Sequence, residues 1–146
     1  MIEILKKQLL KFISPLDYHF EKEEIIKNEV VTHYTSYEVI YKLSSLTRKI
    51  SFSLADYYTH KRVFLFVYNT DGNGHYSLPL DRYLKEYCNI QEDKDVMLLN
   101  QYSGETVEQK IDSFFIHIES IVNDRFFRIL SGQDWVDIST DWYDYK

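Results

Sequence analysis

Hydrophobic residues recur every three or four positions over the first thirteen residues, the spacing of an amphipathic helix. Leu5 and Leu9 fall on one face of such a helix, and lysines occupy other positions. Ser14 and Pro15 follow, and a proline just beyond the last turn is typical of a helix end. The sequence therefore predicts a helix over residues 1–13.

Further along the chain the period changes to two, which is typical of half-buried strands. Alternation over residues 37–43 and 50–54 predicts two strands joined by a turn near residues 44–47. Residues 63–68 (VFLFVY) are apolar at every position, so this third strand is expected within the sheet or covered on both faces. Residues 18–35 fit either a strand or a short helix, and the strand is favoured. Short links between these segments favour an antiparallel meander.

Helical spacing returns in the second half of the chain. Pro79 suits the first turn of a short helix, because a proline there gives up no intrahelical hydrogen bond. A longer helix is predicted over residues 107–130. Thr106 and Gln109 have the spacing of a capping box at its start, and Gly132 supplies a stop at its end.

No repeat, linker or low-complexity tract interrupts this pattern, so residues 1–146 are expected to form one domain. A chain of this length buries roughly 68–70% of its unfolded surface on folding. Its 45% hydrophobic residues are enough to supply a core. The expected fold class is α+β, an antiparallel meander sheet covered by N-terminal and C-terminal helices.

The residues that most catalytic signatures need are scarce. Four glycines are too few and too dispersed to build a phosphate-binding loop. Cys88 is the single cysteine, which excludes an intramolecular disulfide and a CxxC zinc clip, and it falls on an apolar helical stripe typical of a packing thiol. No two of the five histidines lie within five residues of each other, which excludes local zinc motifs. We therefore expect no metal and no cofactor, and carboxylates assembled by the fold leave a small hydrolase open.

One glycine-containing segment has to be weighed as a cation site. Residues 69–74 (NTDGNG) match the start of a calcium loop, with oxygen ligands at the first, third and fifth positions and glycine at the sixth. The match fails at the twelfth position, which is Leu80 where a bidentate Glu is required. Asp-Gly and Asn-Gly pairs suit a tight turn, so a turn is favoured over a cation site.

The net charge of −6 is unevenly spread. Residues 1–70 carry ten Lys and Arg against eight Asp and Glu, whereas residues 71–146 carry seven against fifteen, a balance of −8. A surface of this sign repels nucleic acid and acidic membranes and attracts a basic protein. The longest strongly apolar run is far short of the ~20 residues that cross a bilayer. Lys6 and Lys7 interrupt the place of a signal peptide, so the expected compartment is the cytoplasm.

Aromatic and acidic residues concentrate in the last thirteen residues. Trp135 and Trp142 are the only tryptophans, and each directly follows an aspartate. The segment fits a final edge strand whose aromatics close the core, and it also fits an acidic, aromatic recognition patch. The thirteen tyrosines of the chain suit a binding interface and would also follow from an AT-rich coding sequence. The candidate partner-binding residues are Asp134, Trp135, Asp137, Asp141, Trp142, Tyr143, Asp144 and Tyr145, with Asp56, Tyr57 and Tyr58 as a second group of the same kind.

The segment Gln133-Asp134-Trp135-Val136-Asp137-Ile138, in a small acidic domain rich in tyrosine and aspartate, resembles the immunity proteins of bacterial polymorphic toxin systems. The resemblance implies a cytoplasmic protein that binds a cognate toxin domain, often a basic nuclease, and blocks its active site with carboxylates and tyrosines. The prediction is therefore a non-enzymatic binding protein with a basic protein partner. Two alternatives stay open: a small hydrolase with carboxylates assembled by the fold, and a self-associating structural subunit.

Overall fold

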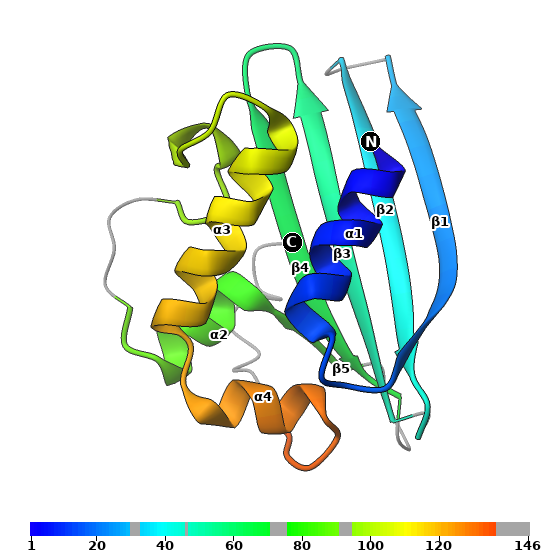
Figure 1. The fold of residues 1–146 in the computed structure, drawn as a ribbon, viewed down its shortest axis with the longest axis vertical. Coiled ribbons are helices and arrows are strands. Elements are labelled where there is room, and N and C mark those ends of the chain that lie inside the picture. Colours follow the sequence, from blue (N-terminus) through cyan, green and yellow to red (C-terminus); the bar gives the residue numbers. More distant parts are fainter. Residues whose placement is uncertain (30–32, 46, 71–75, 91–94, 137–146) are drawn as a thin grey trace.

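The computed structural model describes residues 1–29, 33–45, 47–70, 76–90 and 95–136. Within these ranges, five strands form one antiparallel sheet in the order β1-β2-β3-β4-β5 (Figure 1). The strands are β1 (Tyr18–Asn28), β2 (Tyr34–Leu43), β3 (Arg48–Tyr57), β4 (Lys61–Asn69) and β5 (Tyr76–Pro79). Each strand pairs with the next one along the chain, so the sheet is the predicted meander.

Helices cover one face of this sheet (Figure 1). They are α1 (Ile2–Ile13), α2 (Leu80–Tyr87), α3 (Val107–Ile121) and α4 (Asp124–Leu130), with a 3-10 turn, η1 (Leu99–Gln101), before α3. The first of them confirms the helix predicted over residues 1–13, and it contacts β2, β3 and α3. The fold class is α+β, as predicted. Every helix in the described ranges is too short or too polar to cross a membrane.

The core lies between the helices and the inward face of the sheet. Val39, Phe52 and Leu65 are cross-strand neighbours from β2, β3 and β4, and all three are buried. The centroid of the Phe52 ring lies 4.9 Å from that of Phe115 and 6.3 Å from that of Phe114, so α3 docks on the middle of β3. Burying one side chain of this size contributes about 1.5–3 kcal/mol. The alternating pattern thus specifies which face of β2 and of β3 meets the helices.

β4 is apolar on both faces, and its position in the sheet accounts for that pattern. Leu65 and Val67 are buried under the helices, whereas Phe64 and Phe66 lie on the opposite face and are half-buried. Because β4 pairs with β3 on one side and β5 on the other, its predicted place within the sheet is confirmed. The strand favoured for residues 18–35 is confirmed over residues 18–28 as β1, whereas residues 34 and 35 already belong to β2, a division that the pattern did not predict.

The single helix predicted over residues 107–130 is wrong, because the chain forms two helices there. α3 ends at Ile121, and Asn123 takes an extended conformation with ψ of 170°. The side chain of Asn123 then accepts a hydrogen bond from the amide of Phe126 and caps α4. Apolar residues continue at helical spacing across the break, which is why the pattern conceals it.

The signals at the ends of helices are confirmed at two places and wrong at one. Thr106 and Gln109 form the predicted capping box at the start of α3. Gly132 follows α4 with φ of +84°, a conformation that favours glycine and ends the helix. Pro79 lies outside the helix: it is the last residue of β5 and the N-cap of α2. The pattern does not predict β5, and because this strand is at the edge of the sheet, its proline need not donate a ladder hydrogen bond.

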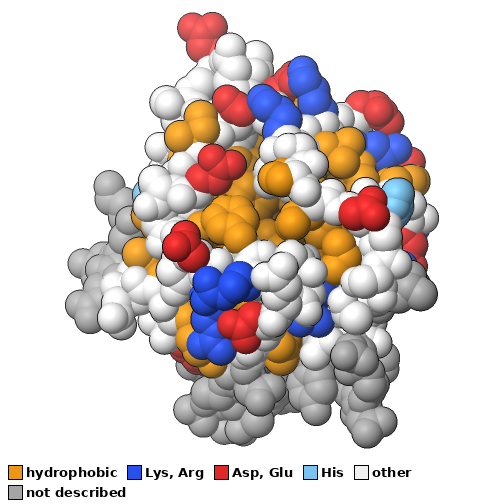
Figure 2. Space-filling model, turned by 60° about the horizontal axis from the view of Figure 1, so that its bottom comes forward, with side chains coloured by type: hydrophobic (Ala, Val, Ile, Leu, Met, Phe, Trp, Pro, Cys, Tyr) orange, Lys and Arg blue, Asp and Glu red, His pale blue; other side chains and the backbone are white. Residues whose placement is uncertain are grey.

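The outer surface of the helical layer combines charged pairs with apolar area. Nζ of Lys7 on α1 lies 2.7 Å from a carboxylate oxygen of Glu108 on α3. Such exposed pairs contribute little to stability, because solvent screens the two charges. Figure 2 shows this side of the molecule with its lower end in Figure 1 turned forward, and hydrophobic side chains gather there among charged ones. Leu10 of α1 and Phe127 of α4 are exposed large hydrophobic residues of this layer.

Candidate functional site

The turn between β3 and β4 presents a large aromatic side chain to solvent. Tyr57 is the last residue of β3, and its amide donates a hydrogen bond to the carbonyl oxygen of His60, 2.9 Å away, which closes the turn. Tyr58 follows, and 96% of its surface is exposed. A side chain this exposed adds nothing to the core, so the whole Tyr58 ring is available to another molecule.

Tyr57 belongs to a row of rings across the end of the sheet. Tyr34, the first residue of β2, is its cross-strand neighbour, and the two ring centroids are 5.1 Å apart. On its other side the His60 ring stacks on Tyr57, with centroids 4.7 Å apart and an interplanar angle of 12°. Aromatic pairs at such separations contribute about 0.5–1.5 kcal/mol beyond burial. Contacts among the rings therefore hold the row in place.

This row borders a pocket between the tips of two hairpins. The pocket has a volume of about 360 Å³ and is lined by residues 27–29, 33–35 and 56–58. The strand registers bring these segments together, because Asn28 of β1 lies opposite Tyr34 of β2, which lies opposite Tyr57 of β3. The predicted candidates Asp56, Tyr57 and Tyr58 thus form one wall of a single pocket.

The pocket carries charges of both signs. Lys27 and Glu29 contribute from the β1 side, and Asp56 contributes from the β3 side. The Asp56 carboxylate lies 3.4 Å from Nζ of Lys61, and the two side chains are 36% and 33% exposed. An ion pair this exposed contributes about 0–1 kcal/mol. Asp56 can therefore exchange Lys61 for a cation of a partner at little cost in stability.

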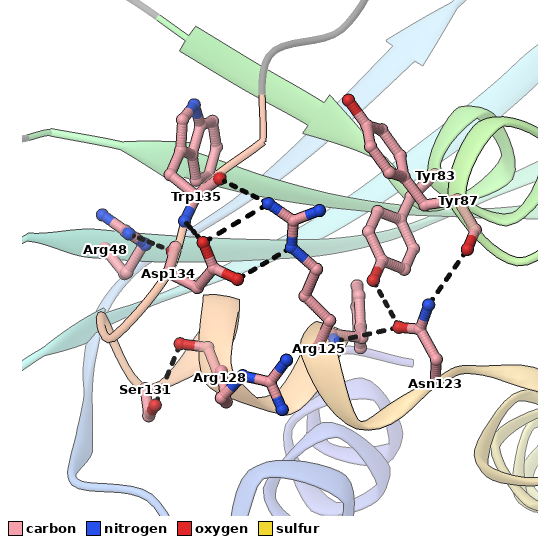
Figure 3. A network of polar contacts seen from close by, with 10 residues as sticks. Arg48, Tyr83, Tyr87, Asn123, Arg125, Arg128, Ser131, Asp134 and Trp135 are labelled. Atoms are coloured by element: carbon pink, nitrogen blue, oxygen red, sulfur yellow. Dashed lines mark hydrogen bonds and ion pairs between the residues drawn. The ribbon is translucent and has the colours of Figure 1, made fainter.

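Asp134 and Trp135 belong to a polar network between α4 and the start of β3 (Figure 3). A carboxylate oxygen of Asp134 accepts a hydrogen bond from Nε of Arg125 at 2.7 Å, and the other accepts one from the amide of Trp135 at 2.7 Å. The Trp135 ring lies against the guanidinium group of Arg48, 4.9 Å from Cζ to the ring centroid. These contacts fasten the chain that follows α4 to the start of β3. Residues 134–136 form no strand, so the edge-strand alternative is wrong for this described part of the segment.

The hydrogen bond from Arg125 holds the pKa of Asp134 below its ordinary value. In an unfolded chain an aspartate titrates near pH ~3.9. Because the folded pKa is the lower of the two, Asp134 stabilises the fold above the unfolded pKa, and this stabilisation is lost as the pH falls through the folded pKa. We expect Asp134→Asn to lower the free energy of unfolding at pH 7, and the difference from wild type to vanish as the pH falls below the folded pKa of Asp134. Urea denaturation at a series of pH values measures the difference.

Asp81→Asn is the matched control for this titration, because Asp81 is an exposed acid in the first turn of α2. It should lower the free energy of unfolding at pH 7 by less than Asp134→Asn does. A deficit of Asp134→Asn that stays constant while the pH falls far enough to protonate Asp134 in the folded protein would contradict the ion-pair explanation and indicate a loss of packing instead.

The two groups of candidate residues lie at opposite ends of β3. Arg48, which contacts Trp135, begins the strand, and Tyr57 ends it. A strand of 10 residues extends about 30 Å. The structure therefore does not bring Asp134 and Trp135 together with the Asp56-Tyr57-Tyr58 segment. The other candidates, Asp137, Asp141, Trp142, Tyr143, Asp144 and Tyr145, lie outside the described residues, as do residues 71–75 of the segment weighed as a calcium loop.

The sequence pattern did not single out Tyr34 and His60, which complete the aromatic row. A signal for Tyr34 does exist in the chain. Once two strands pair around a turn near residues 44–47, counting outward from the turn places Tyr34 opposite Tyr57. His60 has no comparable signal, because its ring reaches Tyr57 only through the shape of the turn.

The described part of the chain holds no group of three or more His, Cys, Asp and Glu side chains placed to bind a metal ion. Cys88 is half-buried, and burial raises the pKa of its thiol, so this thiol is a weak nucleophile at neutral pH. No protein-family model, curated protein or solved structure matches this chain.

Proposed function

We propose that this protein is a non-enzymatic binding protein of the immunity type, which docks a basic toxin domain on the aromatic pocket at the end of its sheet. The observation that supports the proposal is Tyr58, which is 96% exposed. Tyr58 directly follows Tyr57 in the chain, and the Tyr57 ring forms a row with the rings of Tyr34 and His60. Tyrosines in such places are typical of the few residues that carry most of the binding energy of an interface.

The pocket can make two kinds of contact with a basic partner. Its tyrosine rings offer apolar faces and cation–π contacts, and the carboxylates of Glu29 and Asp56 can pair with lysine or arginine. Tyrosine has few side-chain torsions to fix on binding, which keeps the entropic cost of a contact low. Tyr57 is already ordered by its neighbours, so still less freedom is lost there.

The charge of the whole protein acts at longer range. The net charge is −6, and residues 71–146 alone carry −8. A field of this sign speeds the encounter with a basic partner, and salt screens it. We therefore assign the rate of association mainly to the acidic surface and the lifetime of the complex mainly to the tyrosines.

Tyr58→Ala is expected to weaken binding of the cognate partner about 30-fold, which corresponds to about 2 kcal/mol. The products of neighbouring genes are the partners to test first, by calorimetric titration of wild type and variant at low and high salt. Ile116→Ala is the matched control, because it removes an exposed apolar side chain from α3. This control should leave the affinity unchanged, and high salt should slow association with wild type.

Two results would count against this assignment. A partner that binds Tyr58→Ala as tightly as wild type would exclude the pocket as the docking site, and binding that salt does not affect would exclude steering by charge. A hydrolytic activity of the isolated protein that Asp56→Asn abolishes would favour the hydrolase alternative.

A further inference from the structure

β1 is an edge strand whose exposed side chains are unusual for its position. Among the described strands it pairs with β2 alone, and residues 19–27 are all exposed. Ile25 is 54% exposed and Ile26 is 50% exposed, and successive residues of a strand point to opposite faces. The free N–H and C=O groups of an edge are a template for another strand, so edges ordinarily carry charged residues and few apolar ones. The charged residues of β1 are what an edge strand needs to avoid pairing with other strands. They do not explain why two isoleucines are exposed beside them.

A β-bulge divides the strand into two unequal parts. The register of β1 with β2 shifts between Phe20 and Lys22 and then continues without interruption to Asn28. A bulge bends a strand and ends regular pairing, so an added strand can align with Lys22–Asn28 only. Ile25 is the middle residue of that regular stretch.

The regular stretch is complementary to itself in the antiparallel direction. When Ile25 lies opposite Ile25 of a second copy, Glu23 lies opposite Lys27 of that copy, and Lys27 lies opposite its Glu23. Opposite charges facing each other across strands stabilise a pair, and like charges destabilise it. Registers centred on Glu23 or on Glu24 would each set two carboxylates against each other. Only the register centred on Ile25 uses the whole regular stretch and also pairs these charges.

The other face of the strand agrees with the same register. Glu24 falls opposite Ile26 of the copy, and Lys22 falls opposite Asn28, so no like charges meet directly there either. Nζ of Lys6 on α1 already lies 3.1 Å from a carboxylate oxygen of Glu23. Lys27 of a second copy would therefore complete a lysine–glutamate–lysine triad on the helical side of the sheet.

We propose that β1 pairs antiparallel with β1 of a second copy of this chain, about a two-fold axis at Ile25, so that two sheets of 5 strands become one. A two-fold axis perpendicular to the sheet keeps the helices of both copies on the same side, and it makes the interface isologous. The pairing does not involve Tyr58, and its argument does not use the proposed partner, but Lys27 and Asn28 belong both to the paired stretch and to the pocket lining. One strand edge buries less surface than a standard interface, so the dimer dissociates on dilution.

Sedimentation velocity over a wide range of concentration tests this pairing. Wild type should change from monomer to dimer as its concentration rises. Glu23→Lys and Lys27→Glu should each raise the dimer dissociation constant at least about tenfold, because each variant sets like charges opposite each other in two symmetric pairs. The substituted side chains are exposed, and circular dichroism should show the same fold for both.

Mixing the two single variants provides the sharpest result. In a mixed pair the new lysine of Glu23→Lys faces the new glutamate of Lys27→Glu, and the unchanged Lys27 and Glu23 face each other. An equimolar mixture should therefore form heterodimers where neither variant alone dimerises. The double variant Glu23→Lys with Lys27→Glu restores both pairs and should dimerise like wild type. Wild type that stays monomeric at every concentration would overturn the proposal. So would single variants that dimerise as well as wild type, because the register would then be irrelevant.

Discussion

Arg48→Met is expected to lower the free energy of unfolding by about 2–5 kcal/mol, a large part of the roughly 5–15 kcal/mol that holds a typical domain together. Arg48 is only 4% exposed. Its guanidinium donates hydrogen bonds to the carbonyl oxygens of Ile129 at 2.9 Å and Asp134 at 2.6 Å, and to Oδ1 of Asn69 at 3.0 Å. Methionine fills a similar volume and donates nothing, so these acceptors would lose their donor in a buried place.

Urea denaturation of the two proteins measures this loss as a shift of the midpoint. Lys49→Met is the matched control, because the neighbouring side chain points to the other face of the sheet, where its Nζ lies 2.9 Å from a Glu21 carboxylate oxygen. That pair is partly exposed, so the control should cost at most about 1 kcal/mol. Arg48→Lys keeps the positive charge but loses the planar set of guanidinium donors. Its denaturation midpoint should therefore lie between those of Arg48→Met and Lys49→Met. Equal midpoints for Arg48→Met and Lys49→Met would show that the hydrogen bonds of Arg48 contribute nothing to stability.

The expected size of this effect follows from how many segments Arg48 joins. Its hydrogen bonds reach the end of β4, the last turn of α4 and the chain beyond it, and its guanidinium packs on Trp135. One end of the sheet is thereby fixed to the helical layer. The aromatic pocket lies at the other end of β3, where strand pairing and stacked rings are the described contacts. Loss of Arg48 should therefore weaken the fold while leaving the shape of the pocket unchanged in the molecules that remain folded.

The sheet could be predicted from the sequence because the information for it is local. Val39 and Phe52 alternate with polar neighbours, and that alternation alone assigns each of them to the buried face. Short links then leave an antiparallel meander as the simplest arrangement. The same reasoning missed β5, because 4 residues ending in a proline are too few to show a period.

Arg48 and Asn123 could not be predicted, because their roles depend on segments far away in the sequence. An arginine at the start of a strand is ordinarily a surface residue, and nothing local indicates that Ile129 and Asp134 will supply its acceptors. An asparagine within an apolar helical period is likewise inconspicuous. Its break in the helix is stabilised by Tyr83, which belongs to a different helix.

The candidate site was predictable in part. Composition alone singled out Asp56, Tyr57 and Tyr58, and the structure places these three residues in the wall of one pocket. The opposite wall comes from β1, and its position depends on the register of β1 with β2, whose connecting turn the sequence pattern did not locate. Asp134 and Trp135 have the same acidic and aromatic character, but an arginine partner for each gives them a structural role.

Asn123→Ala is expected to lower the free energy of unfolding by about 2–4 kcal/mol, more than the loss of a helix cap alone. Oδ1 of Asn123 accepts hydrogen bonds from the Phe126 amide and from the hydroxyl of Tyr83, whose side chain is fully buried (Figure 3). Its Nδ2 donates to the carbonyl oxygen of Tyr87 at 3.0 Å. Alanine would remove the cap of α4 and leave the Tyr83 hydroxyl buried without this acceptor. Chemical denaturation of the variant measures the combined loss.

Thr106→Ala separates the two contributions, because Thr106 caps α3 at an exposed site without bonding a buried tyrosine, and it should cost about 1 kcal/mol. Tyr83→Phe tests the hydrogen bond between the Tyr83 hydroxyl and Asn123 itself. In the Asn123→Ala background this change removes a donor that has already lost its acceptor, so the two losses together should be smaller than their sum by about 1 kcal/mol. Strictly additive losses would mean that α2 and α4 are stabilised independently. A combined loss smaller than the sum would mean that Asn123 both ends α3 before α4 and binds α2 to these helices. That double role would explain why the helix breaks at a place where the apolar pattern continues.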